Sequence, residues 1–256
     1  AYGHGAVEVG RMIERTRAAD WLGVATVGEG LELRAAGITL PILKLSVARG
    51  DEVTAAVRAG LTLTVTDAAS IQEAGTAASG GTTASVHLKV DTGMRRIGCE
   101  PAEAPGLAAL ADTTPGVRLD GLFSHLPISD SPRGDDFTKT QVELFRATAE
   151  QVEQARGPLL KHLANSGAVL GHPDAWLDLV RPGIMIYGAY PDPEAQRTVP
   201  LLPALEWRTR VTFIKRVRAG ETVGYGRTWT APSDTWTATV PIGYGDGYSR
   251  LLSNRG

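Results

Sequence analysis

The stretch PILKLSVARGDEVTAAVRAGLTLTVTD, residues 41–67, decides the fold. It opens with a short apolar run, continues with an amphipathic stretch at helical spacing, and closes with a second apolar run. Gly60 stands between the last two parts, where a helix that ends needs a residue tolerant of the left-handed conformation. The stretch therefore predicts a strand, a helix and a second strand.

The same order repeats along the first two thirds of the chain. Seven apolar runs span residues 21–27, 41–47, 61–67, 85–91, 119–125, 159–166 and 177–188. Because they are almost continuously apolar, they are typical of parallel strands covered on both faces. Alternating strands and helices indicate an α/β fold, either an open doubly wound sheet or a barrel.

The count of strands favours the barrel. Seven strands are one fewer than a (β/α)8 barrel contains, and residues 2–20 have the pattern of a first helix. We expect the missing first strand to lie upstream of Ala1. Within residues 136–156, four apolar residues at three- and four-residue spacing predict one long helix. We therefore predict a TIM-like (β/α)8 barrel over residues 1–190.

The pattern changes after about residue 200. Residues 204–249 alternate in polarity and are rich in Thr, Val, Trp and Tyr, which is typical of antiparallel strands. A proline-rich stretch over residues 190–203 precedes them. We predict that residues 191–256 begin a mainly β C-terminal domain, incomplete within this sequence.

Composition narrows the classes of function. The 256 residues carry a formal net charge of −2, which gives no electrostatic reason to bind nucleic acid or an anionic membrane. No apolar run has the length of a membrane span. The single cysteine, Cys99, excludes an internal disulfide and favours a reducing, cytoplasmic location. The histidines lack the spacing of metal ligands, so no metal site is expected.

Polar residues gather where the predicted strands end, and in a parallel barrel that end carries the active site. They are Lys89, Asp91, Arg96, His125, His162, Asn165, Ser166 and Arg181. The hydroxyl of Ser166 and the backbone amides of Gly183 and Ile184 could hold a phosphate, because exposed amides at a turn favour an anion. Taken alone, Ser166 could equally be a helix N-cap, and GYGDGY, residues 243–248, could be a simple hairpin turn at Asp246 and Gly247.

Six motifs in this order resemble the alanine racemase family, pyridoxal-phosphate enzymes of fold type III. They are AYGHG, LKVDTGMRRIG, HLANSG, RPGIMIYG, VGYGRTW and PIGYGDGY, and together they cover almost the whole chain. The family usually has glycine where Arg95 stands. Its Schiff-base lysine precedes AYGHG by a few residues, so we expect that lysine upstream of Ala1.

The resemblance implies a site and a mechanism. It implies an enzyme that interconverts L- and D-alanine with two bases, one on each face of the substrate, and supplies D-alanine for the peptidoglycan of the cell wall. The catalytic residues would be Tyr244, His125 and Arg181. The cofactor, pyridoxal 5'-phosphate, would contact Tyr2, Arg96, Asn165, Ser166, Arg181, Gly183 and Ile184. Arg96 would also bind the substrate carboxylate, and Lys89 would be carbamylated.

The resemblance also implies a homodimer in which Tyr244 of one subunit completes the site of the other. Three alternatives stay open at this point. One is a serine racemase or a racemase of broader range with the same fold. Another is a non-enzymatic pyridoxal-phosphate-binding barrel protein, which would not need the tyrosine motif of a second domain. A third is a sugar-phosphate-binding barrel enzyme without this cofactor.

Overall fold

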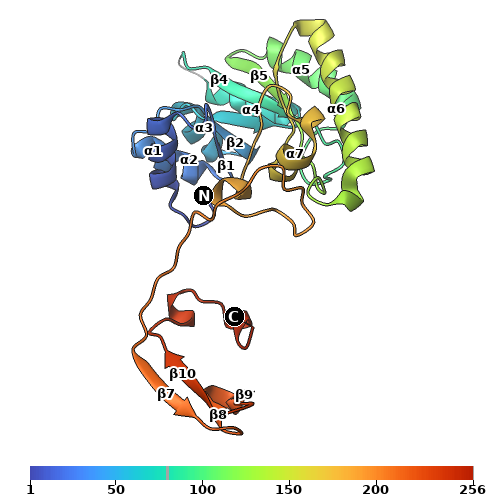
Figure 1. The fold of residues 1–256 in the computed structure, drawn as a ribbon. Coiled ribbons are helices and arrows are strands. Elements are labelled where there is room, and N and C mark those ends of the chain that lie inside the picture. Colours follow the sequence, from blue (N-terminus) through green and yellow to red (C-terminus); the bar gives the residue numbers. More distant parts are fainter. Residues whose placement is uncertain (79–80, 256) are drawn as a thin grey trace. The chain divides into compact units, whose positions relative to one another are not determined.

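The computed structural model describes residues 1–78 and 81–255 (Figure 1). The chain divides into two compact units, the first over Ala1–Ala204 and the second from Leu205 onward. No helix in the described residues is both long enough and apolar enough to cross a membrane. The domain boundary predicted at residue 190 stays a prediction.

The first unit is built on a sheet of six parallel strands. They are β1 (Leu22–Val24), β2 (Ile42–Val47), β3 (Thr62–Val65), β4 (Ala84–Lys89), β5 (Val117–Phe123) and β6 (Leu160–His162). Their order in the sheet is their order in the chain, and every neighbouring pair is parallel. A doubly wound sheet would reverse its strand order at a switch point. The sheet is that of a TIM-like barrel, as predicted.

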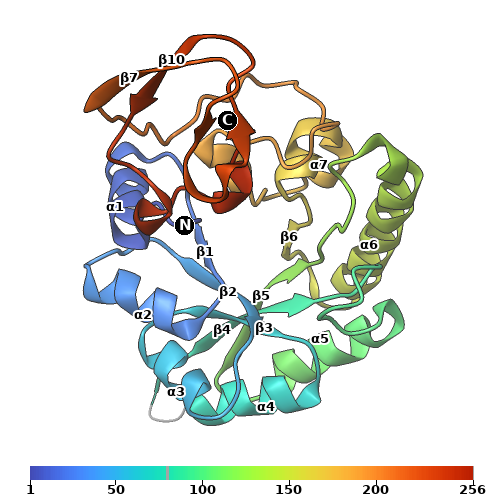
Figure 2. The same cartoon turned by 90° about the horizontal axis from the view of Figure 1, so that it is seen from below.

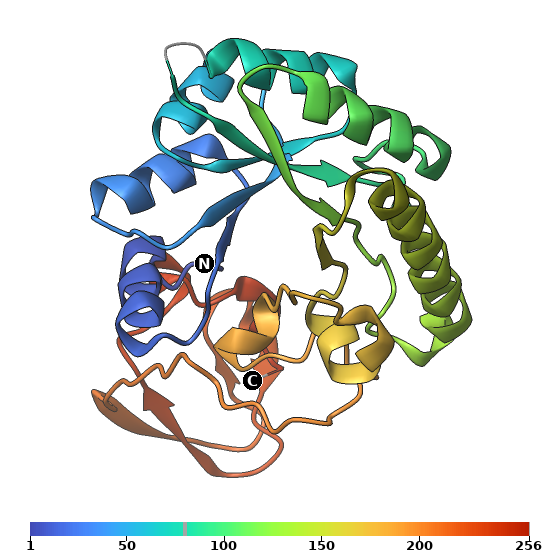
Figure 3. The ribbon, with the colours of Figure 1, turned by 90° about the horizontal axis from the view of Figure 1, so that it is seen from above.

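Helices cover the outside of this curved sheet (Figures 2 and 3). They are α1 (Ala6–Thr16), α2 (Val27–Ala35), α3 (Asp51–Arg58), α4 (Ala68–Ala77), α5 (Ala104–Thr113), α6 (Asp135–Arg156) and the short α7 (Ser166–Gly171). The long helix predicted within residues 136–156 is confirmed as α6. Gly37 and Gly60 follow α2 and α3 with positive φ angles of 84° and 64°, as the helix ends require.

The two faces of β4 differ in character. Val86 and Leu88 belong to the hydrophobic core between sheet and helices. Ser85, His87 and Lys89 alternate with them and therefore face the inside of the barrel. Both faces of this strand are covered, as expected, but the inner face carries buried polar groups rather than apolar ones.

The strand predicted over residues 177–188 is mostly absent. It forms one parallel bridge, between His162 and Leu179, and then a 3-10 helix over Ile184–Tyr187. Pro182 cannot donate to a ladder because it lacks an N–H. The next amide, Gly183 N, donates instead to Ser166 Oγ at 2.9 Å. The chain is therefore turned out of the sheet just after Arg181.

One arginine joins two helix ends on the outer layer. Arg34 of α2 donates from Nε to the carbonyl of Ala59 and from Nη2 to that of Gly60, both at the end of α3. Its Nη1 donates to the carbonyls of Ile38 and Leu40 at 2.8 Å. A cation is favoured beside helix C-termini, where carbonyls lack intrahelical partners.

The second unit contains short antiparallel strands. β7 (Phe213–Val217) pairs with β10 (Thr235–Thr239), and β8 (Thr222–Val223) pairs with β9 (Trp229–Thr230). The mainly β character predicted for this region is confirmed. Tyr244 begins a 3-10 turn over Tyr244–Asp246, which replaces the simple hairpin turn considered above, and its side chain is exposed.

Candidate active site

The ends of β4 and β6, together with Arg181, bring three site residues around one ring, that of Phe123. The ammonium of Lys89 lies 5.2 Å from the ring centroid, and the guanidinium of Arg181 lies 5.4 Å from it. The ring of His162 stacks on Phe123 with a centroid distance of 4.6 Å. The predicted gathering of polar groups at these strand ends is therefore present in the first unit.

Arg181 is the most firmly held of these residues. Its Nη2 donates to the carbonyls of Ser124 at 2.7 Å and Leu163 at 3.0 Å, and its Nη1 lies 2.7 Å from His162 Nδ1. Burial lowers the pKa of Arg181 to about 10, so the guanidinium keeps its charge at neutral pH. A guanidinium has no acceptor atom, so it acts here only as a donor.

His125 lies near three positively charged residues of this site. Burial, and then the charges of Arg181, Lys89 and Arg96, lower its pKa to about 3. The ring is therefore neutral at physiological pH. A neutral imidazole has one donor and one acceptor nitrogen, so His125 can exchange hydrogen bonds with a phenol or carboxylate without adding a fourth positive charge.

Lys89 is a buried lysine among like charges. Burial, Arg96 and Arg181 lower its pKa to about 8, and Asp91 partly opposes them. The carboxylate of Asp91 already accepts hydrogen bonds from the backbone amides of Gly93 and Arg95. Lys89 is thus near two other cations and one carboxylate, and this excess of positive charge suits an anionic ligand such as a phosphate or a carboxylate.

The loop after β4, which carries Arg96, folds back onto its strand. Asp91 N donates to the carbonyl of Cys99 at 2.8 Å, and Cys99 N donates to that of Lys89 at 3.0 Å. Gly98 permits this approach, because a Cβ built there would lie 2.5 Å from Asp91 N. The return of the loop therefore positions Lys89 and Arg96 together.

A second corner collects the residues expected around a phosphate. Asn165, not Ser166, caps α7, because Asn165 Oδ1 accepts from Ala168 N at 3.1 Å. The Ser166 hydroxyl accepts instead from Gly183 N. A Cβ on Gly183 would lie 2.7 Å from the Tyr2 hydroxyl. Tyr2, Ser166 and Gly183 thus lie side by side, with Ile184 next in the chain.

Sequence reasoning missed Phe123 and His87, which build the base of this site. Both are fully buried. The signal for His87 was its place in the alternation of SVHLK, which puts it on the same strand face as Lys89. Tyr244 belongs to the second unit, and its role stays a prediction.

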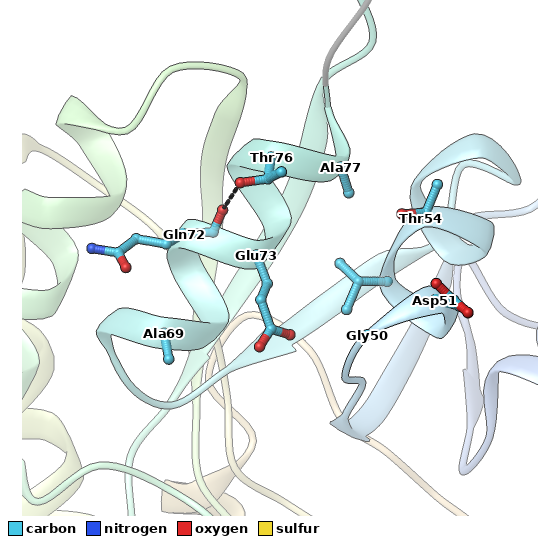
Figure 4. A pocket seen from close by; sticks show the side chains of 9 residues that line it. Gly50, Asp51, Thr54, Ala69, Gln72, Glu73, Thr76 and Ala77 are labelled. Atoms are coloured by element: carbon cyan, nitrogen blue, oxygen red, sulfur yellow. Dashed lines mark hydrogen bonds between the residues drawn. The ribbon is translucent and has the colours of Figure 1, made fainter.

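An open groove of about 430 Å³ lies elsewhere, between α3 and α4 on the outside of the first unit (Figure 4). Its polar lining comes from Asp51, Thr54, Gln72, Glu73 and Thr76. None of the predicted site residues lines it. The predicted site residues therefore lie at the strand ends rather than in this groove.

The fold and the site together define a TIM-like barrel protein whose strand ends suit an anionic ligand. Comparison with known proteins makes the family specific. The model of the alanine racemase N-terminal domain matches residues 1–191, and that of the alanine racemase C-terminal domain matches residues 204–256. The chain belongs to the alanine racemase family, whose members are isomerases.

Individual relatives agree with this assignment. The chain is 53% identical to the alanine racemase of Cutibacterium acnes, over 100% of this chain and 68% of the relative. It is 41% identical to that of Treponema denticola, over 99% of this chain and 68% of the relative. The chain thus spans about two thirds of the length of these relatives.

Solved structures show the same fold. Alanine racemase from E. faecalis superposes with a TM-score of 0.88 at 34% identity, over 98% of this chain and 68% of that one. Alanine racemase from Bacillus anthracis with bound L-Ala-P superposes with a TM-score of 0.82 at 34% identity, over 98% of this chain and 66% of that one.

Proposed function

We propose that this chain forms the active site of an alanine racemase that interconverts L- and D-alanine with pyridoxal 5'-phosphate and supplies D-alanine for the cell wall. The observation that carries the proposal is the cluster of Lys89, Arg96 and Arg181 around a neutral His125. The two arginines of this cluster suit a substrate with a carboxylate, whether Lys89 is an ammonium or a carbamate.

The residues of the first unit fit this cofactor. We propose that Tyr2, Ser166 and the amides of Gly183 and Ile184 hold its phosphate, with Asn165 orienting the turn. The space beside Gly183 that a Cβ would fill supports this, since it brings the Tyr2 hydroxyl within reach of the same corner. When bound, pyridoxal phosphate supplies an electron sink that acidifies the Cα–H bond of the amino acid.

Arg181 and Arg96 would orient the bound molecules. A buried guanidinium that remains charged can donate a hydrogen bond to a ring nitrogen, but it does not readily give up a proton. Arg181 would therefore leave the ring nitrogen unprotonated, which limits the electron sink and suppresses side reactions. Arg96 would bind the carboxylate of the substrate.

Proton transfer would need one base on each face of Cα. We propose that Tyr244 serves one face, within the site of a second copy of the chain in a homodimer. A free tyrosine has a pKa of about 10, so it is a weak base near neutrality. Nearby cations stabilise a phenolate, and Arg181 with His125 as intermediary would supply that help.

Lys89 would become a carbamate in the active protein. Its amine attacks carbon dioxide, the N–C bond forms, and the amine loses a proton. A pKa of about 8 leaves a substantial fraction of the amine neutral and nucleophilic near pH 8. The carbamate replaces a cation with an anion, so repulsion of Arg96 becomes attraction.

Tyr244→Phe tests the two-base assignment in the full-length protein. We expect racemisation to fall at least about 100-fold in both directions, because each direction uses both bases. Exchange of the α-proton with solvent should persist from one antipode and vanish from the other. Tyr248→Phe, four residues along in the same motif, should leave both exchanges unchanged.

Equal loss of exchange from both antipodes in Tyr244→Phe would refute the role of a one-face base. A racemisation assay with serine and other amino acids, run beside alanine, measures the substrate range directly. Retained cofactor absorbance in the variant shows that the loss concerns proton transfer rather than cofactor binding.

A further inference from the structure

Two buried histidines lie in line behind Arg181. His162 Nδ1 lies 2.7 Å from Arg181 Nη1, and His162 Nε2 lies 2.8 Å from His87 Nδ1. Both rings are fully buried inside the barrel. The line of contacts thus runs from the guanidinium at the site into the interior of the sheet.

The direction of donation in this line is fixed at its first member. Arg181 can only donate, so His162 Nδ1 must accept. A neutral imidazole that accepts at Nδ1 carries its proton at Nε2, so His162 donates to His87 Nδ1. His87 in turn carries its proton at Nε2. The line therefore holds two neutral rings of the same tautomer.

The surroundings exclude a charged ring in this line. A proton on either Nδ1 would set a donor against a donor. Burial and the charge of Arg181 lower the pKa of His87 to about 4, although Asp120 partly opposes them. Burial, Arg181, His87 and Lys89 lower the pKa of His162 well below its usual value.

The far ring is held in place by its neighbours. A Cβ on Gly121, which pairs with His87 across β4 and β5, would lie 2.7 Å from the ring. Trp21 packs beside it with a centroid distance of 5.4 Å. Within the described residues, His87 Nε2 is buried without a hydrogen-bond partner. A buried N–H without a partner is costly. We therefore infer that His87 stands here for its acceptor atom, Nδ1, which receives the hydrogen bond from His162.

We propose that His162 and His87 are positioning residues that fix the rotation of the Arg181 guanidinium through one line of donated hydrogen bonds. The carbonyls of Ser124 and Leu163 take the two Nη2 hydrogens, with His125 Nδ1 further away at 3.5 Å, and His162 takes one hydrogen at Nη1. Among the described residues no hydrogen bond uses the Nε–H of Arg181. The remaining Nη1–H and the Nε–H are thus the donors presented to a ligand, which under the proposed function is the ring nitrogen of the cofactor.

The tautomers can be measured without any activity. The full-length protein is labelled with 15N at histidine, and two-bond 15N–1H correlations assign the protonated nitrogen of each ring. We expect His87 and His162 to be neutral and protonated at Nε2 throughout pH 6 to 8, the range in which an unperturbed histidine changes charge. A ring protonated at Nδ1, or on both nitrogens, would overturn the proposal.

Two substitutions test the positioning role. His87→Asn keeps an acceptor oxygen near the position of Nδ1, whereas His87→Leu removes it at similar volume. We expect His87→Leu to lower kcat about tenfold, which corresponds to an increase of about 1.4 kcal/mol in the activation free energy. His87→Asn should keep most of the wild-type kcat. Of these two variants, only His87→Leu should shift the NMR signals of the Arg181 side-chain N–H groups.

Gly121→Ala gives an independent approach, because it displaces the His87 ring from the opposite strand. It should shift the His162 and Arg181 signals as His87→Leu does. Wild-type kcat and unshifted Arg181 signals in His87→Leu would overturn the positioning role. If the wild-type protein shows no racemisation, the proposed function fails, and the tautomer measurement still decides the fate of this inference.

Discussion

Gly98→Ala should be one of the most destabilising single changes in the first unit. Gly98 has a φ of 144° and stands where the loop after β4 returns to its strand. A Cβ there would lie 2.5 Å from Asp91 N and 2.8 Å from the carbonyl carbon of Val90. Both atoms are backbone, so no side-chain rotation relieves the overlap.

The cost can be worked from the contacts. A residue forced into a sparsely populated positive-φ region costs about 1–3 kcal/mol. Separating the strands would also remove the hydrogen bonds Asp91 N to Cys99 O and Cys99 N to Lys89 O, each contributing about 1 kcal/mol. The sum is about 3–5 kcal/mol, a large share of the roughly 5–15 kcal/mol that stabilises a typical domain.

Urea unfolding of the full-length protein measures this free energy. Gly106→Ala is the matched control, because a Cβ on this exposed residue of α5 meets nothing within 4 Å. The control should be neutral or stabilise by up to about 1 kcal/mol. If the free energy of unfolding of Gly98→Ala lies within about 0.5 kcal/mol of the wild-type value, the close packing of this loop on its strand does not hold Lys89 and Arg96 in place.

Three further predictions concern the same region. Arg95 has a φ of 55°, and its side chain forms an exposed ion pair with Glu100. Arg95→Gly and Arg95→Ala both lose this ion pair, but only alanine keeps the left-handed strain, so the glycine variant should be more stable by about 1 kcal/mol in urea unfolding. Equal stability of the two variants would contradict this. The folded pKa of His87, about 4, lies below the unfolded value, so the unfolded state binds more protons between about pH 4 and 6.5 and stability falls on acidification through that window. Between pH 7 and 5, His87→Asn should therefore lose about 2 kcal/mol less free energy of unfolding than the wild type. An unchanged dependence of this free energy on pH would refute the prediction. Protein equilibrated with 13C-bicarbonate should show one carbamate 13C signal that is missing in Lys89→Met; a signal that survives the substitution would assign the modification elsewhere.

The repeating parts of the fold could be predicted from sequence because they rest on local signals. The helical spacing of Val142, Phe145, Ala149 and Val152 predicted α6, and Gly37 and Gly60 predicted helix ends. The strand predicted over residues 177–188 was wrong because its local signal is ambiguous. Residues 184–187 are apolar, and an apolar run of that length suits a strand or a short helix equally.

The gathering of charged residues at the strand ends could be predicted, and the roles of these residues stay predictions. Charged residues at strand ends stand out in a sequence, and Lys89, His125 and Arg181 do lie together. His87 could not be found in this way, because a histidine within an apolar strand has the same local pattern as a core residue. Its partner lies 75 residues further along the chain, and only the register of the sheet brings the two rings into contact.

The arginine that joins the ends of α2 and α3 has a consequence for how the barrel opens. Without Arg34, each strand–helix repeat could fluctuate away from the sheet by itself. A single guanidinium bound to carbonyls of both repeats makes them open as one cooperative unit. In native-state hydrogen exchange, the amides of Ile38 and Leu61, each bonded within its own helix end, should then share one opening free energy. In Arg34→Met they should exchange at independent rates.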